Sequence, residues 1–390
     1  MSIAAVRRHR WLVLSAAAAY SMSTLFSAMK PILLTRFVEQ HGWSNALAGL
    51  AVAMPFAGIA IAALCIAPLT RLSLRRLAVV FGAVLVTAEL GSALGHASAA
   101  VVLALQFSGG FAVGILMGAS SRIIATTDLA GPLFGAVDMI AVLLMSAMVA
   151  IVGTAVGYGG LTGGYLVAAV IGALLAVAML PYKNPALITT ASTATLVVSV
   201  RALAVVAMGV IFVTCSGLGF TYMFTVAQEL GIGYADAGRS IGLLLFVSAF
   251  VCLLGGWASA RYGPYRPLAI AFIACAGGWY GVVHAPSPVV FYASLVPAVF
   301  ALQFNFPVLL DLAGSLDRTG RWGAIAAPLQ TSGFAWAAIL AGLIVGRFGL
   351  DALPKATAIG MLVCLCLLAV ASRRRTAAES TFVRDDAVSD

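Results

Sequence analysis

Apolar stretches of about 20 residues follow one another along nearly the whole chain, and each is long enough to cross the hydrocarbon core of a bilayer as a helix. Hydrophobic residues make up 62% of the 390 residues and charged residues only 9%, which leaves too little polar surface to cover a soluble globule of this size. We therefore expect an all-α, polytopic membrane protein. Charges, glycines and prolines bound the stretches and predict twelve transmembrane helices, at 11–35, 44–66, 76–95, 99–122, 133–156, 162–181, 202–228, 237–259, 267–284, 288–311, 322–346 and 353–371.

Twelve helices place both termini on one side, and the basic residues indicate which side that is. With a cytoplasmic N-terminus, the outer side keeps only Lys30, Arg36, Arg239, Arg347 and Lys355 of the 22 Lys and Arg residues. Cytoplasmic loops of membrane proteins are rich in Lys and Arg, so this asymmetry predicts cytoplasmic N- and C-termini. We expect a multi-pass protein of the cell inner membrane in a bacterium, acting as a monomer.

The same distribution argues against several function classes. The net charge is +9, but the basic residues lie in short clusters between apolar stretches and form no basic domain for nucleic acid. The four histidines have no metal-ligand spacing, and the chain has no phosphate-binding loop of the Gly-x-x-x-x-Gly-Lys type. We therefore predict that the protein is not an enzyme and uses no cofactor or metal. The expected partners are a small-molecule substrate, protons and the lipid bilayer.

A polar segment, YKNPALITTASTATLVVSVR at 182–201, divides the chain near its middle. The segment after the second predicted helix, APLTRLSLRRLAVV at 67–80, resembles the segment after the eighth, GGWASARYGPYRPLAI at 255–270, which indicates two related halves. We predict an N-terminal six-helix bundle at 1–181, a cytoplasmic linker at 182–201, a C-terminal six-helix bundle at 202–371 and a cytoplasmic tail at 372–390.

These two loops carry a family resemblance. In the major facilitator superfamily, the loop after the second helix typically has the pattern Gly-x-Leu-Ala-Asp-Arg-x-Gly-x-Arg-Arg. The loops here resemble it at Arg71, Arg75 and Arg76 in the first half and at Gly256, Arg261, Gly263 and Arg266 in the second, whereas Thr70 and Ala260 stand at the aspartate position. The resemblance covers nearly the whole chain. It implies two pseudo-symmetric six-helix bundles, transport by alternating access, and a cavity lined by the first, fourth, seventh and tenth helices.

Charged residues near the cytoplasmic ends of the helices are candidates for a gate. In the family, the loop aspartate helps to hold the cytoplasmic side closed, and its absence from both loops leaves the charge partner of the gate open. Asp138 and Arg122 lie at the same end of neighbouring predicted helices, where they form either a structural ion pair or part of a proton relay or gate. Asp311, at the inner end of the tenth helix, has the same interpretations. The predicted gating residues are Arg71, Arg75, Arg122, Arg261 and Arg266.

Lys30 stands in an apolar stretch, TLFSAMKPILLT at 24–35. A charge is costly in lipid and usually faces a wet cavity or a partner. Tyr20, Ser23, Ser27 and Lys30 are spaced 3, 4 and 3 residues apart, which places them on one helix face and suits a water-lined path. The alternative is that Lys30, about 11 Å from the helix centre toward the outer end, snorkels to the headgroups. We predict Lys30 as an anion-binding residue, with Tyr20 and Ser27 beside it.

Glu89 is the carboxyl group expected nearest the middle of the membrane. It lies about 20 Å along its helix from Arg76, and its short side chain cannot easily reach the headgroups. A buried carboxyl group that alternately meets water and a cation can bind and release a proton, so we predict Glu89 and Asp138 as proton-coupling residues. The alternative is a glutamate that stays protonated and hydrogen-bonds between helices.

Further polar side chains lie on helices near the expected cavity. The tenth helix carries Gln303 and Asn305 beside Pro307, and amides next to an interrupted backbone suit a binding site. Thr221 occupies the position opposite Lys30 in the second half. Each of these side chains can instead bridge neighbouring helices or bond to its own helix. The predicted substrate-binding residues are Lys30, Tyr20, Ser27, Gln106, Thr221, Gln303, Asn305 and Gln330.

The sequence thus predicts a secondary active transporter, a symporter that moves a small organic anion together with protons. A proton-coupled exporter of amphipathic drugs or metabolites is the alternative, because Gly153, Gly157, Gly159 and Gly160 weakly resemble the antiporter pattern of family exporters. Small residues at such spacing more often let two helices approach closely. A non-transporting membrane sensor or scaffold is a third interpretation, because both loop aspartates are missing.

Overall fold

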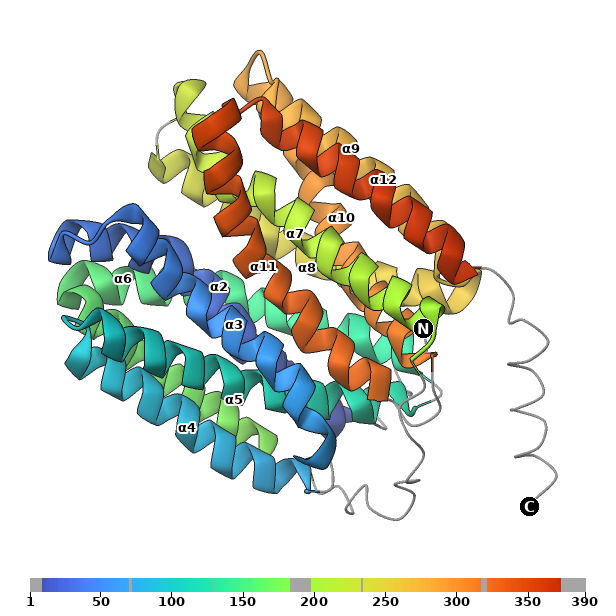
Figure 1. Ribbon diagram of the computed structural model, residues 1–390, viewed down its shortest axis with the longest axis horizontal. Coiled ribbons are helices and arrows are strands. Elements are labelled where there is room, and N and C mark those ends of the chain that lie inside the picture. Colours follow the sequence, from blue (N-terminus) through green and yellow to red (C-terminus); the bar gives the residue numbers. More distant parts are fainter. Residues whose placement is uncertain are drawn as a thin grey trace.

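The computed structural model describes residues 9–69, 72–127, 129–182, 198–232, 234–316 and 321–372 (Figure 1). All regular secondary structure in these ranges is helical. They contain 12 stretches that are long and apolar enough to span a membrane, as predicted. The elements in chain order are α2 (Arg10–His41), α3 (Asn45–Leu69), α4 (Leu74–Gly95), α5 (Ala99–Ala125), α6 (Ala130–Met179), α7 (Val200–Glu229), α8 (Tyr234–Tyr262), α9 (Tyr265–Val283), α10 (Pro288–Gly314), α11 (Arg321–Phe348) and α12 (Ala352–Ser372).

The element α6 joins two of the predicted helices, 133–156 and 162–181, through a sharp turn. Gly160 lies in this turn with φ 58° and ψ −151°, a backbone conformation that glycine adopts without strain. The chain reverses at this turn. The reversal brings Gly163 so close to Ala155 that a Cβ atom on Gly163 would lie 2.5 Å from the carbonyl oxygen of Ala155. The two predicted helices are therefore separate membrane-spanning segments that follow each other around a glycine turn.

The helices gather into two groups. In the first group, α2 packs on α6, α3 packs on α5, and α4 packs on both α5 and α6. In the second group, α10 packs on α8 and α9, while α7 packs on α11 and α12. Figure 1 shows the groups side by side, with their helices running in nearly the same diagonal direction. The predicted fold class is confirmed, whereas the bundle boundaries stay a prediction, since 183–197 and 373–390 lie outside the described residues.

The two ends of the molecule differ in charge. Arginines gather at one end, which we call the basic end and define by Arg10, Arg75, Arg201, Arg261 and Arg266. The opposite end is called the histidine end and is defined by His41, His96 and His284. At the basic end, Arg201 donates a hydrogen bond to the Tyr265 hydroxyl (3.0 Å), which donates to the carbonyl oxygen of Ala371 (3.2 Å), so the starts of α7 and α9 lie beside the end of α12.

The two groups meet tightly at the basic end. Ala125, at the end of α5, lies against Gly314 of α10 and Gly323 of α11. A Cβ atom on Gly135 would lie 2.6 Å from the carbonyl oxygen of Cys252, so a glycine is needed where α6 approaches α8. In contrast, α2 and α7 share at most a marginal contact in the described chain. The basic end is therefore closed by direct contact between the groups.

Candidate transport site

Lys30 reaches across the interface between the two helix groups. Its Nζ donates a hydrogen bond to the backbone carbonyl oxygen of Phe334 in α11 (3.1 Å). The ring of Phe334 also meets Phe56 of α3, with ring centroids 6.3 Å apart. Among the described residues, no carboxylate pairs with Lys30. The acceptor of its hydrogen bond is a neutral carbonyl oxygen. The amine thus lies in a contact between helices of the two groups.

The polar face of α2 continues from Lys30 toward the basic end. The Tyr20 hydroxyl and the Ser121 hydroxyl of α5 lie 2.7 Å apart, and the Tyr20 ring meets Phe306 of α10 edge to face with centroids at 6.4 Å. Ser23 donates to the carbonyl oxygen of Tyr20 (2.7 Å), and Ser27 is half-buried. Tyr20 therefore contacts both groups.

Asp138 lies on the same interface, in the first segment of α6. It is buried, and its Oδ2 has no hydrogen-bond partner among the described residues. It is close enough to act electrostatically on Tyr20 in α2 and on Cys252 in α8. A buried carboxyl oxygen without a partner is unfavourable for stability, which marks it as a functional candidate. Arg122 is also buried, and its ion pair with Asp138 stays a prediction.

Glu89 lies inside the first group rather than on the interface. It is fully buried in α4, and Gln106 of α5 donates through Nε2 to Glu89 Oε1 (3.4 Å) and to Ser92 Oγ (3.1 Å). Neither Glu89 Oε2 nor the Tyr165 hydroxyl of α6 has a partner in the part of the chain that the structure describes. Glu89 is close enough to Tyr165 to act on it electrostatically. We call these four side chains the Glu89 cluster: Glu89, Ser92, Gln106 and Tyr165.

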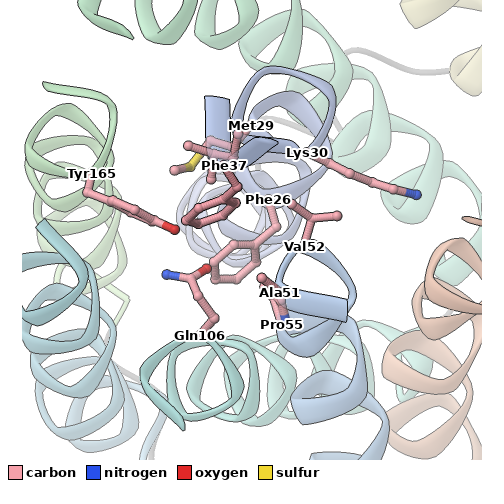
Figure 2. Close-up of a pocket in the computed structure, with 10 residues that line it drawn as sticks. Phe26, Met29, Lys30, Phe37, Ala51, Val52, Pro55, Gln106 and Tyr165 are labelled. Carbon is pink, nitrogen blue, oxygen red and sulfur yellow. The ribbon is translucent and has the colours of Figure 1, made fainter. Parts of the chain in front are cut away.

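A cavity of about 10 Å³ adjoins the Glu89 cluster (Figure 2). In Figure 2 the Tyr165 hydroxyl and the Gln106 amide point into this cavity, whereas the amine of Lys30 points away from it. Lys30 still lines the cavity, together with Phe26 and Met29 from the same helix. A space of roughly 10–15 Å³ holds one water molecule. One water therefore fits between the Glu89 cluster and the interface helix that carries Lys30.

Three predicted amides of the second group are buried. Asn305 of α10 is fully buried, and neither its Oδ1 nor its Nδ2 has a partner among the described residues. The Nε2 of Gln330 in α11 is unpaired in the same way, and Gln303 is buried beside Asn305 on α10. Thr221, in contrast, is exposed and donates to the carbonyl oxygen of Gly217 in its own helix (2.7 Å), as in the alternative interpretation. Asn305 and Gln330 therefore have polar groups free for a ligand or water.

The predicted gating arginines differ in their positions. Arg75, Arg261 and Arg266 are exposed at the basic end, and Arg71 lies outside the described residues. Arg122, the remaining one, is buried near the end of α5.

Asp311 of α10 supplies a carboxylate at the closed basic end. Ser259 of α8 donates a hydrogen bond to its Oδ2 (2.5 Å). A Cβ atom on Gly131 would lie 3.0 Å from the same oxygen. Since α6 begins at Ala130, Asp311 lies beside the N-terminus of a helix from the other group. The free N–H groups of a helix N-terminus attract negative charge, so this arrangement favours contact between the groups.

The residues at these sites that were not predicted from the sequence include Ser92, Tyr165 and Phe334. Ser92 follows Glu89 by three residues in α4, a spacing that could have identified it as a neighbour on the same helix face. Tyr165 and Phe334 come from helices distant in the sequence, and Phe334 contributes only a backbone oxygen. No local spacing could have indicated them.

The sequence matches the profile of the Major Facilitator Superfamily over residues 12–327. The chain belongs to this superfamily. No curated protein sequence matches it. The human organic anion transporter MFSD10 (TETRAN) has a similar structure, with a TM-score of 0.72 at 17% identity over 92% of this chain and 99% of that chain.

Two sugar-related structures of the superfamily are also similar. The proton:xylose symporter XylE bound to 6-bromo-6-deoxy-D-glucose has a TM-score of 0.71 at 14% identity, over 92% of this chain and 93% of that chain. The transporter FucP in the outward conformation has a TM-score of 0.67 at 14% identity, over 93% of this chain and 99% of that chain. At such identities the likeness shows the fold alone.

Membership of the major facilitator superfamily confirms the predicted family and makes the protein a multi-pass membrane transporter. Superfamily members carry small molecules across membranes, and the prediction that the chain is not an enzyme agrees with this. The site of interest is then the interface between the two helix groups, where Lys30, Tyr20 and Asp138 lie.

Proposed function

We propose that this superfamily member moves a small organic anion together with protons, by alternating access at the interface between the two helix groups. The observation that carries the proposal is the hydrogen bond from Lys30 to the carbonyl oxygen of Phe334. A carboxylate is a stronger acceptor for an ammonium group than a neutral carbonyl, so an anionic ligand would displace Phe334. Displacement would also break a link between α2 and α11, which couples binding to motion of the groups.

The Glu89 cluster is the proposed proton site, with Asp138 as a second carboxyl group on the interface. The cavity beside Gln106 and Tyr165 has room for one water that would link the cluster toward Lys30. Protonation of Glu89 would remove a negative charge from the helix group that carries Lys30, and the loss of a negative charge favours binding of an anion. By linkage, anion binding would favour protonation to the same degree, which is the requirement for symport.

The basic end is the proposed cytoplasmic gate of a transporter in the inner membrane. The asymmetry of Lys and Arg supports a cytoplasmic position for this end, where the two groups are in direct contact. Asp311 at the N-terminus of α6 would take the role of the aspartate that both loops lack. The arginines at 71, 75, 122, 261 and 266 stay the proposed gating residues, and the monomer stays the proposed working unit.

One of the glycines behind the exporter alternative, Gly160, has another explanation in the structure. Gly160 forms the turn of α6 with a positive φ. Cβ atoms on Gly157 and Gly159 would meet no atom within 4 Å, so neither residue is needed for close helix packing. We therefore keep export of amphipathic compounds only as an outcome of the experiment below.

The test is uptake of a panel of radiolabelled small carboxylic acids by proteoliposomes under an imposed pH gradient. We expect Lys30→Ala to reduce uptake by about tenfold or more, because the ammonium group stabilises the bound anion by an amount typical of a charged hydrogen bond. Lys30→Arg should retain part of the uptake, since it keeps the charge. Lys355→Ala is the matched control, because Lys355 is exposed at the start of α12 and should leave uptake unchanged.

Three results would contradict this function. Full uptake by Lys30→Ala of every acid that the wild type carries would remove the anion site. Transport of amphipathic drugs without transport of any acid would support the exporter, and no flux of either class would support a sensor or scaffold.

A further inference from the structure

A long apolar groove runs along the second helix group. It has a volume of about 460 Å³ and is lined by residues of α8, α9 and α10. The helices α8 and α9 contact each other little, whereas each of them packs extensively on α10. The groove therefore lies between α8 and α9, and α10 forms its floor with Pro297, Phe300, Ala301 and Phe304.

The groove has the length of one leaflet of a bilayer. Along α8 its lining extends from Tyr262 at the basic end to Val251. These positions are about 17 Å apart along the helix at 1.5 Å per residue. Half of the hydrocarbon core is about 15 Å thick. The groove thus starts where headgroups lie and ends near the middle of the bilayer, which is the depth that one acyl chain covers.

The mouth of the groove carries a positive charge. Of the described residues that line the groove, Arg266 is the only charged one, and it is exposed at the start of α9. Tyr262, at the end of α8, lines the same mouth and is 60% exposed. An arginine side chain binds phosphate groups through two parallel hydrogen bonds. Basic pockets between membrane helices bind anionic lipid headgroups in the same manner.

We propose that this groove binds an anionic phospholipid of the surrounding bilayer, with one acyl chain between α8 and α9 and the headgroup phosphate on Arg266. The apolar lining accepts a hydrocarbon chain and offers no partner to a small hydrophilic anion inside it. Arg266 lies at the depth of the lipid phosphates, so its positive charge complements the negative charge of a phosphate there. The site lies outside the interface between the groups that holds Lys30. Arg266 is also a proposed gating residue, but the experiment below measures lipid binding and not transport, so its failure is distinguishable from a failure of the function proposed above.

The test is native mass spectrometry of the purified full-length protein with phosphatidylglycerol and phosphatidylcholine that have identical acyl chains. We expect the wild type to retain one phosphatidylglycerol in preference to phosphatidylcholine by about fivefold, the effect typical of one arginine near an anionic surface. Arg266→Gln should bring the two lipids to nearly equal retention. Arg75→Gln is the matched control, because Arg75 is exposed at the same end but does not line the groove.

A second variant tests the acyl chain rather than the headgroup. Ala274 is a half-buried lining residue of α9, and Ala274→Trp would fill part of the groove. We expect it to lower retention of both lipids while thermal unfolding stays similar to that of the wild type.

Several outcomes would overturn the proposal. Equal retention of both lipids by the wild type would remove the charge selectivity. An equal loss with Arg75→Gln and Arg266→Gln would show a general surface effect. A protein dimer that Ala274→Trp abolishes would show that a second copy occupies the groove.

Discussion

At the scale of single residues, the carboxyl group of Glu89 stands out because it combines full burial with an incomplete set of hydrogen bonds. Gln106 donates to Oε1, and Oε2 has no partner in the described chain. A buried polar oxygen without a partner lowers the stability of the fold by about 1–3 kcal/mol. A group with this cost is a candidate for binding a proton or a water molecule.

Glu89→Gln keeps the shape of the side chain and an oxygen that accepts from Gln106, but it cannot exchange a proton. We expect an apparent Tm within about 3 °C of the wild type. Proton-driven uptake should lose its dependence on pH between about pH 6 and about pH 8, while substrate exchange across the membrane persists. Uptake and counterflow by proteoliposomes measure the two effects. Glu229→Gln, an exposed position at the end of α7, is the control, and an unchanged pH profile in Glu89→Gln would exclude the proton role.

His96 gives the stability of the protein a dependence on pH. It lies just beyond α4 at the histidine end, with Nδ1 2.8 Å from Nε2 of His41 and Nε2 2.8 Å from the hydroxyl of Thr162. Burial, followed by the effect of His41, lowers the pKa of His96 from its usual value of 6.5. The unfolded chain then binds more protons than the folded one just below pH 6.5. The stability from the neutral pair is therefore present above that pH and is lost as the pH falls through the folded-state pKa.

We accordingly expect the unfolding temperature to fall when the pH is lowered from about 7.5 to about 5.5. His96→Asn should make this fall smaller, because the residue that titrates is gone. His284→Asn is the control, since among the described residues His284 hydrogen-bonds to its own helix, at the carbonyl oxygen of Tyr280. Thermal unfolding followed by tryptophan fluorescence measures the slope, and an equal slope in His96→Asn and the wild type would refute the role of the pair.

At the scale of helices, the apolar pattern predicted where each span lies but not where each helix ends. The first predicted helix stops at residue 35, whereas α2 continues to His41. The apolar pattern predicts the part of a helix that lies inside the hydrocarbon core. Polar residues extend the helix beyond the core into the headgroup region. Tyr20 and Lys30 both contact helices of the second group, and their spacing could be read from the sequence because helical periodicity is local.

The contacts of Asp311 could not be predicted in this way. Its position beside Gly131 and Ser259 depends on how α6, α8 and α10 pack, and the sequence separates these helices widely. Glu89 shows the same limit, since the depth of the residue was predictable but its burial inside the first group was not.

The gate at the basic end gives a prediction for α6 and α10 together. Asp311→Asn retains an acceptor for Ser259 and removes the charge beside the N-terminus of α6. A charge at a helix terminus contributes about 0.3–2 kcal/mol, so the open population should rise by about 1.7-fold up to about thirtyfold. Spin labels at Thr126 and Ser315, both exposed at the basic end, measure the opening as a longer distance.

Asp351→Asn, exposed at the histidine end, is the control for this experiment. The gate would be refuted by identical distance distributions in Asp311→Asn and the wild type, recorded in a background without native cysteines.

At the scale of the whole molecule, the orientation of the basic end determines on which side of the membrane the two groups are in contact. Ser98 lies in an exposed turn at the histidine end, and Ser315 lies at the basic end. In intact cells, an impermeant maleimide should label Ser98→Cys, while Ser315→Cys should react only after the membrane is permeabilised. The exposed native Cys65 and Cys366 must first be replaced. The reverse pattern would invert the proposed orientation and with it the side of the membrane on which the groups are in contact.

The seam between α6 and α8 has an electrical consequence. Gly131 meets Gly256 there, and Gly135 meets the backbone of Cys252, so main chain rests on main chain. At these two glycine contacts the backbones lie too close together to leave room for a hydrated ion. A resting copy of the protein would therefore be expected to leak few ions along this seam.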